Sequence, residues 1–395
     1  MAVILMSVLI DMMGIGIVVP VLPELIRSVA HTDISDASVV GGWLFVAYSA
    51  MQFLFGPLVG NLSDAYGRRP VLLISIFGLF VDYLVTAYAP SIGWLFLGRS
   101  VAGLCGASYT TANAYVTDIT PPEGRAKAFG YIGAAFGLGF VLGPAVGGLL
   151  GSFGPHVPFL AAAGLSLVNF VFGLVALPES LAPENRRRLR WRRANPFGAV
   201  MSLKRHRALL RWAISLLLFF LAQSVYVSVW AFAAIERYGW DEKQIGLSLA
   251  LVGVTSAIVQ GLLMGPLIRA TGEWRAAVIG LGVATVSAVG FAAATQGWMV
   301  YALIVAGSLQ GIAMPAVNAM MSHEVAPEQQ GELQGAVASL QGIASIIGPL
   351  MMTQTFAMFT APGAIVMFAG APYALSAALF GLAALLLVSP RRAHR

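Results

Sequence analysis

Charged side chains are scarce in this sequence. Only 10% of its 395 residues are Asp, Glu, Lys or Arg, whereas 58% are hydrophobic. A soluble domain carries roughly a quarter charged residues because its surface faces water. The scarcity excludes a soluble globule, and apolar runs longer than the ~20 residues that cross a bilayer indicate a membrane protein. An all-α fold of twelve spanning helices is expected, over about 1–27, 38–60, 70–89, 91–117, 125–151, 157–178, 209–235, 243–268, 275–294, 297–322, 331–359 and 364–388.

Metal-binding and catalytic residues are also sparse. The one cysteine, Cys105, excludes a disulfide framework and a thiolate metal site. The five histidines are scattered over loops and chain ends, so no metal is expected. A phosphate-binding Gly-x-x-x-x-Gly-Lys loop is lacking, which leaves ATP-driven transport unsupported. No cluster of nucleophile, base or metal ligands favours an enzyme. The start lacks a charged leader and cleavage site, so 1–27 is expected to be the first span.

The net charge of +6 is placed asymmetrically. Alternating the loops across the membrane puts most basic residues, including the arginine-rich linker 179–208, on one side: Arg68, Arg69, Arg125, Lys127, Arg269, Arg275, Arg391 and the run Arg186–Arg193. The opposite side holds only Arg27, Arg237 and Lys243. Basic loops stay in the cytoplasm, so both termini and the linker are predicted to be cytoplasmic. The linker arginines are interpreted as a topology anchor beside anionic lipid, not as a nucleic-acid site.

The two halves of the sequence repeat with one fixed offset. Five landmarks recur 205 residues later: Gly60 and Gly265, Asn113 and Asn318, Pro122 and Pro327, Gly130 and Gly335, Gly143 and Gly348. The repeat predicts an N-terminal six-helix bundle (1–178), a basic cytoplasmic linker (179–208) and a C-terminal six-helix bundle (209–395). Parallel repeats of this kind place a substrate between the halves near the midplane, and rocking of the halves alternates access.

A compact motif, GNLSDAYGRRPVLL, joins the second and third spans. Its predicted functional residues are Gly60, Asp64, Gly67, Arg68 and Arg69. The glycines suit a tight reversal, and Asp64 can meet an arginine or the start of a neighbouring helix. We expect such a pair to hold a cytoplasmic gate closed. The alternative is that the arginines only set topology.

The fifth span carries glycines at small-residue spacing. Gly139, Gly143 and Gly147 lie four residues apart, and Pro144 adds a kink. Close helix packing would explain this stripe by itself.

Three ionisable residues lie well inside the spans: Asp11, Asp82 and Arg99. An unpaired charge in hydrocarbon costs several kcal/mol. The helical rise puts Asp82 and Arg99 at about one level and Asp11 near mid-membrane. Either aspartate could pair with Arg99 in one state and carry a proton in another, which is what proton coupling requires. The alternative is a static Asp–Arg staple.

Polar and aromatic side chains in the inner spans are candidates to line an amphipathic cavity. They are Tyr48, Gln52, Asn113, Gln223, Tyr226, Trp230, Gln260, Gln310, Asn318 and Gln341. Hydrogen bonding between helices would explain most of them equally well. The pair Met314-Pro315 predicts a local distortion of the tenth span.

These motifs resemble the major facilitator superfamily. The 60–73 loop, GRSVAGLCGA (98–107) and GAAFGLGFVLGPAVGG (133–148) match its loop, proton-coupling and antiporter motifs. DMMGIGIVVPVLPEL (11–25) and AYVTDITPPEGRAKAFG (114–130) are similar to the tetracycline/proton antiporters. The resemblance implies a proton-driven exporter of amphipathic small molecules in the bacterial inner membrane, expected to be monomeric, powered by the proton gradient without a cofactor. It also implies that the fifth-span glycines seal a proton leak.

The sequence departs from the tetracycline pattern in its second half. That family carries an aspartate in helix 9 and a histidine in helix 8, where this sequence has Ala284 and Ser256. Coupling would then run through the first half alone, and tetracycline itself is not assured as the substrate. An uptake symporter or facilitator of a metabolite, and a lipid flippase on the same fold, stay open as alternatives.

Overall fold

A computed structural model describes residues 1–106, 108–187, 207–326 and 329–388. Within these ranges ten helices are long and apolar enough to cross a membrane, and the bent pair α1–α2 adds an eleventh span. The first six expected spans correspond to α1 (Ala2–Val18) with α2 (Leu22–Ala30), α3 (Ile34–Tyr66), α4 (Arg68–Ala87), α5 (Ile92–Cys105) with α6 (Ser108–Ile119), α7 (Arg125–Gly151) and α8 (Val157–Ala176). The expected all-helical membrane fold is confirmed.

The second six spans are built from more broken helices. They correspond to α10 (Arg207–Ser228) with α11 (Trp230–Tyr238), α12 (Glu242–Ile258) with α13 (Met264–Thr271), α14 (Glu273–Ala293), α15 (Gly297–Gly307) with α16 (Ala313–His323), α17 (Gln330–Thr360) and α18 (Ala371–Val388). A π-helical turn, Val259–Leu263, connects α12 to α13, and a 3₁₀ turn, Ser308–Ile312, connects α15 to α16.

The chain divides into two compact units. The first comprises Met1–Pro196 with Gly239–Gly253, and the second comprises Phe197–Tyr238 with Val254–Arg395. The predicted boundaries 1–178, 179–208 and 209–395 remain predictions, because most of the linker, including Arg188, Arg190, Arg192 and Arg193, lies outside the described residues.

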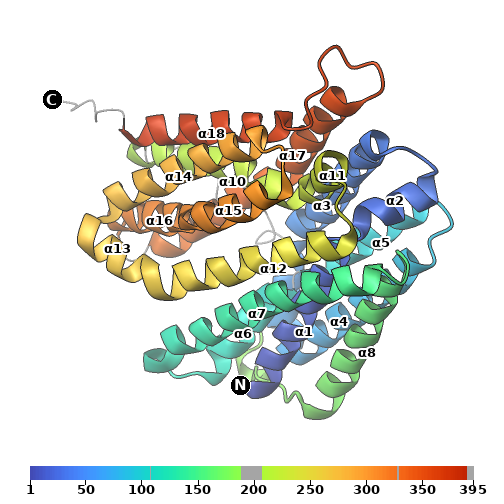
Figure 1. The fold of residues 1–395 in the computed structure, drawn as a ribbon. Helices are drawn as coiled ribbons and strands as arrows, with labels where there is room; N and C mark the ends of the chain where they lie inside the picture. Colours follow the sequence, from blue (N-terminus) through green and yellow to red (C-terminus); the bar gives the residue numbers. More distant parts are fainter. Residues whose placement is uncertain (107, 188–206, 327–328, 389–395) are drawn as a thin grey trace. The chain divides into compact units, whose positions relative to one another are not determined.

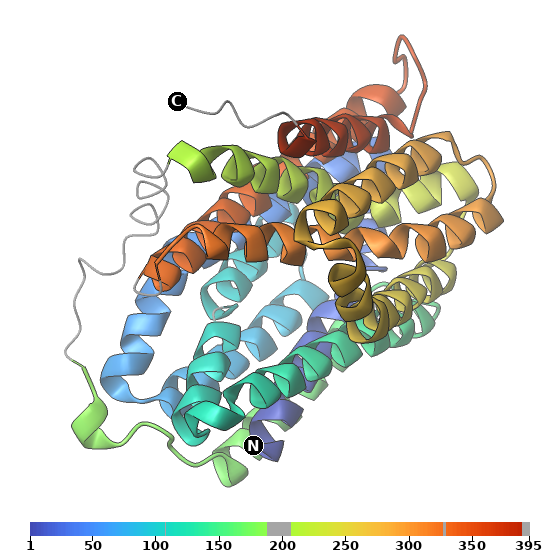
Figure 2. The same ribbon diagram turned by 90° about the vertical axis from the view of Figure 1, so that its left-hand side faces the viewer.

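Within the first unit, α1 is a central element. It packs along α7 and α8, while α4 packs against α5 and α8, and α5 also contacts α3. The dark blue α1 lies against the teal α7 in Figure 1 and again in the view turned by 90° in Figure 2. In the second unit, α10 packs against α17 and α18, and α14 packs against α16 and α18.

The internal repeat is visible in the helix boundaries. α14 begins at Glu273, which is 205 residues after Arg68, the first residue of α4. The same offset separates the starts of α5 and α15, of α6 and α16, and of α7 and α17. The glycines that precede α4 and α14, Gly67 and Gly272, both have a positive φ (110° and 78°). Equivalent segments therefore fold alike in both halves.

Five of the expected continuous spans are each divided between two helices, and three of these breaks bear on the site. The first bends by 51° between α1 and α2, where Pro20 lacks the amide hydrogen that a continuous helix needs. The fourth breaks after Cys105, and the tenth changes to a 3₁₀ turn at Ser308–Ile312, just before the predicted distortion at Met314-Pro315. The two breaks are equivalent under the repeat, since Gly106 corresponds to Gly311. Irregular backbone at such depth is typical of cavity-lining segments in transporters.

Candidate functional site

Asp82 and Arg99 form a buried ion pair. Asp82 lies on α4 and Arg99 on α5, and the Arg99 guanidinium donates to Asp82 Oδ2 at 2.5 Å. The Asp82 side chain is 1% exposed and that of Arg99 is 15% exposed. Thr86, one turn further along α4, donates its hydroxyl to Asp82 Oδ1 at 3.2 Å. The pair expected from the helical rise is therefore assembled in this structure.

A glycine permits this pairing. A Cβ atom on Gly98, next to Arg99, would lie 2.8 Å from Asp82 Oδ1 and 2.7 Å from the Thr86 hydroxyl. Only a residue without a side chain lets α5 approach α4 this closely at the level of the ion pair.

Asp11 has a different partner. It lies on α1, is 6% exposed, and accepts a hydrogen bond at 2.9 Å from the side-chain amide of Asn169 on α8. The same amide group donates to the Ser7 carbonyl at 3.2 Å. No cation binds Asp11 among the described residues. The expectation that either aspartate could pair with Arg99 is met only by Asp82 in this conformation.

Asn169 was not identified from the sequence. A single asparagine in the apolar run of α8 has no motif around it, and helix packing alone brings it to Asp11. The one feature of the sequence that could have indicated Asn169 is its polar side chain within a segment of mean hydropathy 2.1. Its Oδ1 atom and the Ser7 hydroxyl are both buried without a hydrogen-bond partner.

The glycine stripe of α7 is a packing surface for α1. Cβ atoms on Gly139, Gly143 and Gly147 would collide with the backbone carbonyls of Leu9, Met13 and Ile17, respectively. Because these three carbonyls lie on successive turns of α1, the stripe fixes the contact along most of its length. Pro144 continues inside α7 without ending the helix. The geometry accounts for the stripe by close packing, and its role in sealing a proton leak stays a prediction.

The 60–73 motif forms a charge network around Arg68. Its guanidinium contacts Asp64 at 2.5 Å and Asp118, on α6, at 3.0 Å, and it also donates to the Ser63 hydroxyl at 3.1 Å. Arg69 instead donates to the Leu174 carbonyl at 2.7 Å, near the end of α8. Arg68 therefore links three helices of the first unit, which exceeds what a topology signal alone requires.

Glu179 completes this network and was missed from the sequence. Its carboxylate accepts the backbone amides of Arg68 at 2.8 Å and Arg69 at 3.3 Å, which are the first two of α4. It thereby caps a helix whose own N-cap position, Gly67, has no side chain. A Cβ on Gly67 would collide with this carboxylate. Gly60 shows no such constraint, because a Cβ there would meet no atom within 4 Å.

The cavity candidates of the first unit are tied to the helix break. Gln52 on α3 donates to the Gly106 carbonyl at 3.1 Å and to the Tyr48 hydroxyl at 3.4 Å. These bonds support the end of α5, so interhelical bonding explains both residues here. Asn113 is half-buried on α6.

The candidates of the second unit behave differently. Gln223, Gln310 and Asn318 each keep a buried side-chain oxygen without a hydrogen-bond partner among the described residues. The Tyr226 hydroxyl interacts with the Gln310 side chain. Tyr226 also belongs to an aromatic cluster with Trp230, Phe291 and Tyr373, whose ring centroids lie 5.4 to 6.3 Å apart in the contacting pairs. Gln260, in the π-helical turn, and Gln341, on α17, are exposed. Buried oxygens without a partner and a cluster of aromatic rings in the same unit are features that a polar aromatic ligand would satisfy.

The two residues that depart from the tetracycline pattern, Ala284 and Ser256, have different surroundings. Ala284 is fully buried in the hydrophobic core of the second unit, and Ser256 is half-buried on α12. The membrane-embedded carboxylates on which coupling could depend are therefore Asp11 and Asp82, both in the first unit.

Comparison with known proteins identifies the family to which the chain belongs. Residues 4–349 match the Major Facilitator Superfamily. The class C tetracycline resistance protein of Escherichia coli is 42% identical, over 90% of this chain and 89% of its own length, and the class G protein of Vibrio anguillarum is 38% identical, over 89% of each. Among solved structures, the human organic anion transporter MFSD10 superimposes with a TM-score of 0.72 at 24% identity, over 98% of each chain. A bacterial Spinster homologue gives 0.79 at 14% identity, over 98% and 95%. The chain belongs to the major facilitator superfamily and, within it, to the family of the tetracycline resistance proteins.

Proposed function

We propose that the protein is a proton-coupled exporter of amphipathic drugs in the bacterial inner membrane, with both termini in the cytoplasm. The observation that carries the proposal is the presence of two buried carboxyl groups in membrane-spanning helices, one with a cation partner and one without. Ionisable residues within membrane spans are expensive to maintain and mark ion or proton pathways.

The coupling is confined to the first unit. Asp82 is neutralised by Arg99, whereas Asp11 is held only by the neutral amide of Asn169. Protonation changes the charge of a carboxyl group and hence its preferred partner. Substrate binding and protonation can therefore act on the same conformational change. That shared change exchanges a substrate molecule for a proton across the membrane. The proton gradient supplies the energy, and no cofactor takes part.

The substrate is proposed to be an aromatic, hydrogen-bonding small molecule. The cluster around Tyr226 and Trp230 offers ring surface, and the unpaired oxygens of Gln223, Gln310 and Asn318 offer hydrogen-bond acceptors. Tetracyclines are molecules of this kind, and the relatives described above are named as tetracycline resistance proteins. This chain has the buried Ala284 where the tetracycline antiporters have an acidic residue. Tetracycline is therefore one of the compounds to be tested, and the proposal does not assume that it is the substrate.

Everted membrane vesicles from a host that lacks its own drug pumps provide the test. The vesicles are energised to create a ΔpH, and compounds are added one at a time from a panel that includes tetracycline and chemically unrelated aromatic drugs. An exporter coupled to protons dissipates the ΔpH when its substrate is added and also accumulates that substrate inside the vesicle. Equilibration of the drug across the membrane without ΔpH dissipation would identify a facilitator, and movement only in the opposite direction would identify an uptake symporter. Either result would refute the proposal.

A further inference from the structure

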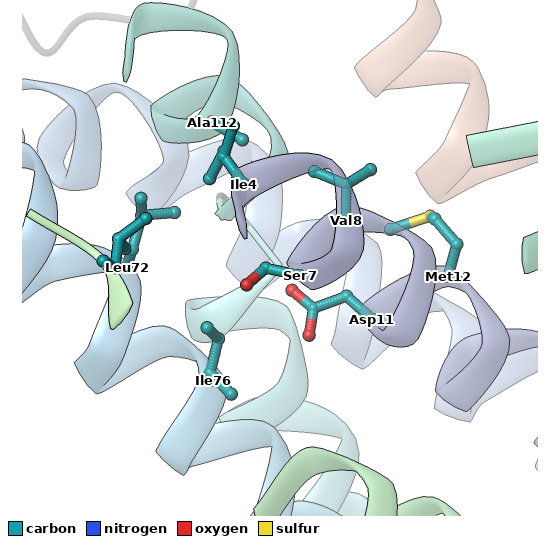
Figure 3. Close-up of a pocket in the computed structure, with 9 residues that line it drawn as sticks. Ile4, Ser7, Val8, Asp11, Met12, Leu72, Ile76 and Ala112 are labelled. Atoms are coloured by element: carbon teal, nitrogen blue, oxygen red, sulfur yellow. The ribbon is translucent and has the colours of Figure 1, made fainter. Parts of the chain in front are cut away.

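A small cavity adjoins Asp11 and is not explained by the ion pair or by the motifs. It has a volume of about 10 Å³, which is at the lower limit for one water molecule. Ser7 and Asp11 line it from α1, and apolar side chains that include Leu72, Ile76 and Ala112 close it from α4 and α6. Figure 3 shows the Ser7 hydroxyl and the Asp11 carboxylate pointing into the same space, opposite Leu72 and Ile76.

The polar groups around the cavity are incompletely bonded. Asn169 donates a hydrogen bond to Oδ1 of Asp11, whereas Oδ2 accepts no hydrogen bond from the described residues. The Ser7 hydroxyl is buried and has no partner. A buried polar atom without a partner is rare in native proteins and commonly marks an ordered water. A water here would have the two polar partners that such a site needs as a minimum.

We propose that Asp11 and Ser7 form a binding site for one water molecule, through which Asp11 gains and loses its proton, and that Asn169, which lies outside the cavity lining, is the residue that positions Asp11 for this exchange. Asn169 donates to Asp11 Oδ1 and to the Ser7 carbonyl, one turn apart on α1, and so directs Oδ2 to the cavity. In the exchange, a hydronium ion at the site passes one proton to Oδ2 and leaves a neutral carboxyl group and a water. The reverse step returns the proton to the water. This inference rests on the proposed function.

Few other titratable groups face Asp11. α8 has none between Val157 and Ala176. α4 contributes Tyr83, whose hydroxyl lies against Gly14 one turn after Asp11. α7 carries Arg125, Lys127 and Tyr131 near its start, and Lys127 lies over the Tyr131 ring. α6 carries Asp118, which binds Arg68, and Tyr115, which donates to the Pro178 carbonyl. Asp82 is engaged by Arg99. These pairings leave the cavity water as the exchange partner for Asp11.

The cavity offers a matched pair of variants. Ala112→Val adds two methyl groups to the cavity wall and displaces the water without touching the Asp11–Asn169 hydrogen bond. Ala128→Val makes the same change in the same apolar cluster, but Ala128 does not line the cavity. Ser7→Ala removes a water ligand directly. Asn169→Leu replaces the amide with an apolar side chain of similar volume, and Ser166→Ala alters another buried polar residue of α8 outside the cavity lining.

The first readout needs no substrate. Infrared difference spectra of the purified protein between acidic and alkaline pH are recorded in ordinary water and in water labelled with oxygen-18. We expect an O–H stretching band that shifts with the label in the wild type and in Ala128→Val, and that is absent in Asp11→Asn, Ser7→Ala and Ala112→Val. Lack of the band in the wild type, or its persistence in Ala112→Val, would overturn the proposal even if drug export is confirmed.

The second readout separates positioning from structure. ΔpH-driven uptake is compared with counterflow, in which labelled drug exchanges for unlabelled drug without net proton movement. We expect Asn169→Leu and Ala112→Val to reduce ΔpH-driven uptake at least about tenfold, the effect of roughly one lost hydrogen bond to a charged group. Counterflow and drug binding should stay within about twofold of Ser166→Ala and Ala128→Val. Equal loss of both activities in the folded variants would indicate a purely structural role, and retention of both would show that Asn169 and the water are dispensable. A wild type that lacks ΔpH-driven uptake of every compound would instead refute the proposed function, while the infrared result still decides the water site.

Discussion

Removing Arg99 should reveal whether the Asp82–Arg99 pair is part of the transport cycle or only a structural contact. In Arg99→Met, Asp82 keeps its 1% exposed side chain but loses the guanidinium at 2.5 Å. Breaking a buried pair by removing one partner destabilises a protein by about 3–5 kcal/mol, because a charge is left buried without compensation. That energy corresponds to roughly two to four powers of ten in an equilibrium constant.

The double variant Asp82→Asn/Arg99→Met separates stability from coupling. Replacing both charged partners by neutral ones is often close to neutral for stability, and the Asn side chain can still accept the Thr86 hydroxyl. We therefore expect thermal unfolding in detergent to be shifted far down in Arg99→Met and largely restored in the double variant. Transport driven by ΔpH should be lost in both.

Two results would refute this reasoning. A double variant that exports as the wild type does, at matched insertion, would show that the pair is a static staple. An Arg99→Met variant as stable as the wild type would show that Asp82 does not depend on the arginine for compensation. Asp82→Asn alone completes the cycle and measures how much of the effect belongs to the pair.

Three further predictions concern the side that is predicted to be cytoplasmic. Asp64→Asn should lower transport several-fold while leaving the protein folded and inserted, because it removes one of the two carboxylates that hold Arg68; normal transport at matched expression would contradict it. Replacing three or more arginines within Arg186–Arg193 should leave transport nearly intact, and complete loss of transport with orientation preserved would point to a functional linker. Glu179→Ala should destabilise the protein by about 1 kcal/mol, as loss of a helix cap does, whereas the exposed Glu184→Ala should not; unfolding midpoints compare them, and equal midpoints would show that the cap is not used.

The fold could be predicted largely from the sequence because lipid imposes a simple rule on it. Every backbone polar group in hydrocarbon must be bonded within its own segment, so long apolar runs become helices. The repeat offset then carried over directly to the helix boundaries of α4 and α14. The bend at Pro20 and the break after Cys105 were not predicted, because a proline or glycine in a membrane span can also be tolerated within a continuous helix.

The candidate site was predictable where the signal was charge and not where it was packing. Asp82 and Arg99 could be matched by helical rise along two neighbouring spans. Asn169 and Glu179 could not, since each acts on a residue more than 100 positions away and neither lies in a recognisable motif. The partner of Asp11 depends on how α1 rotates against α8, and the glycines of α7 set that rotation through contacts that sequence spacing does not specify.

The central claim is that drug leaves in exchange for protons carried by the first unit. The most direct measurement places the wild type, Asp11→Asn and Asp82→Asn in proteoliposomes and records drug accumulation under an imposed ΔpH beside drug binding by fluorescence quenching. The account predicts accumulation against a gradient in the wild type, none in either variant, and retained binding in at least one of them. Accumulation against a gradient in both variants would show that protons do not couple through Asp11 and Asp82, and would contradict the account.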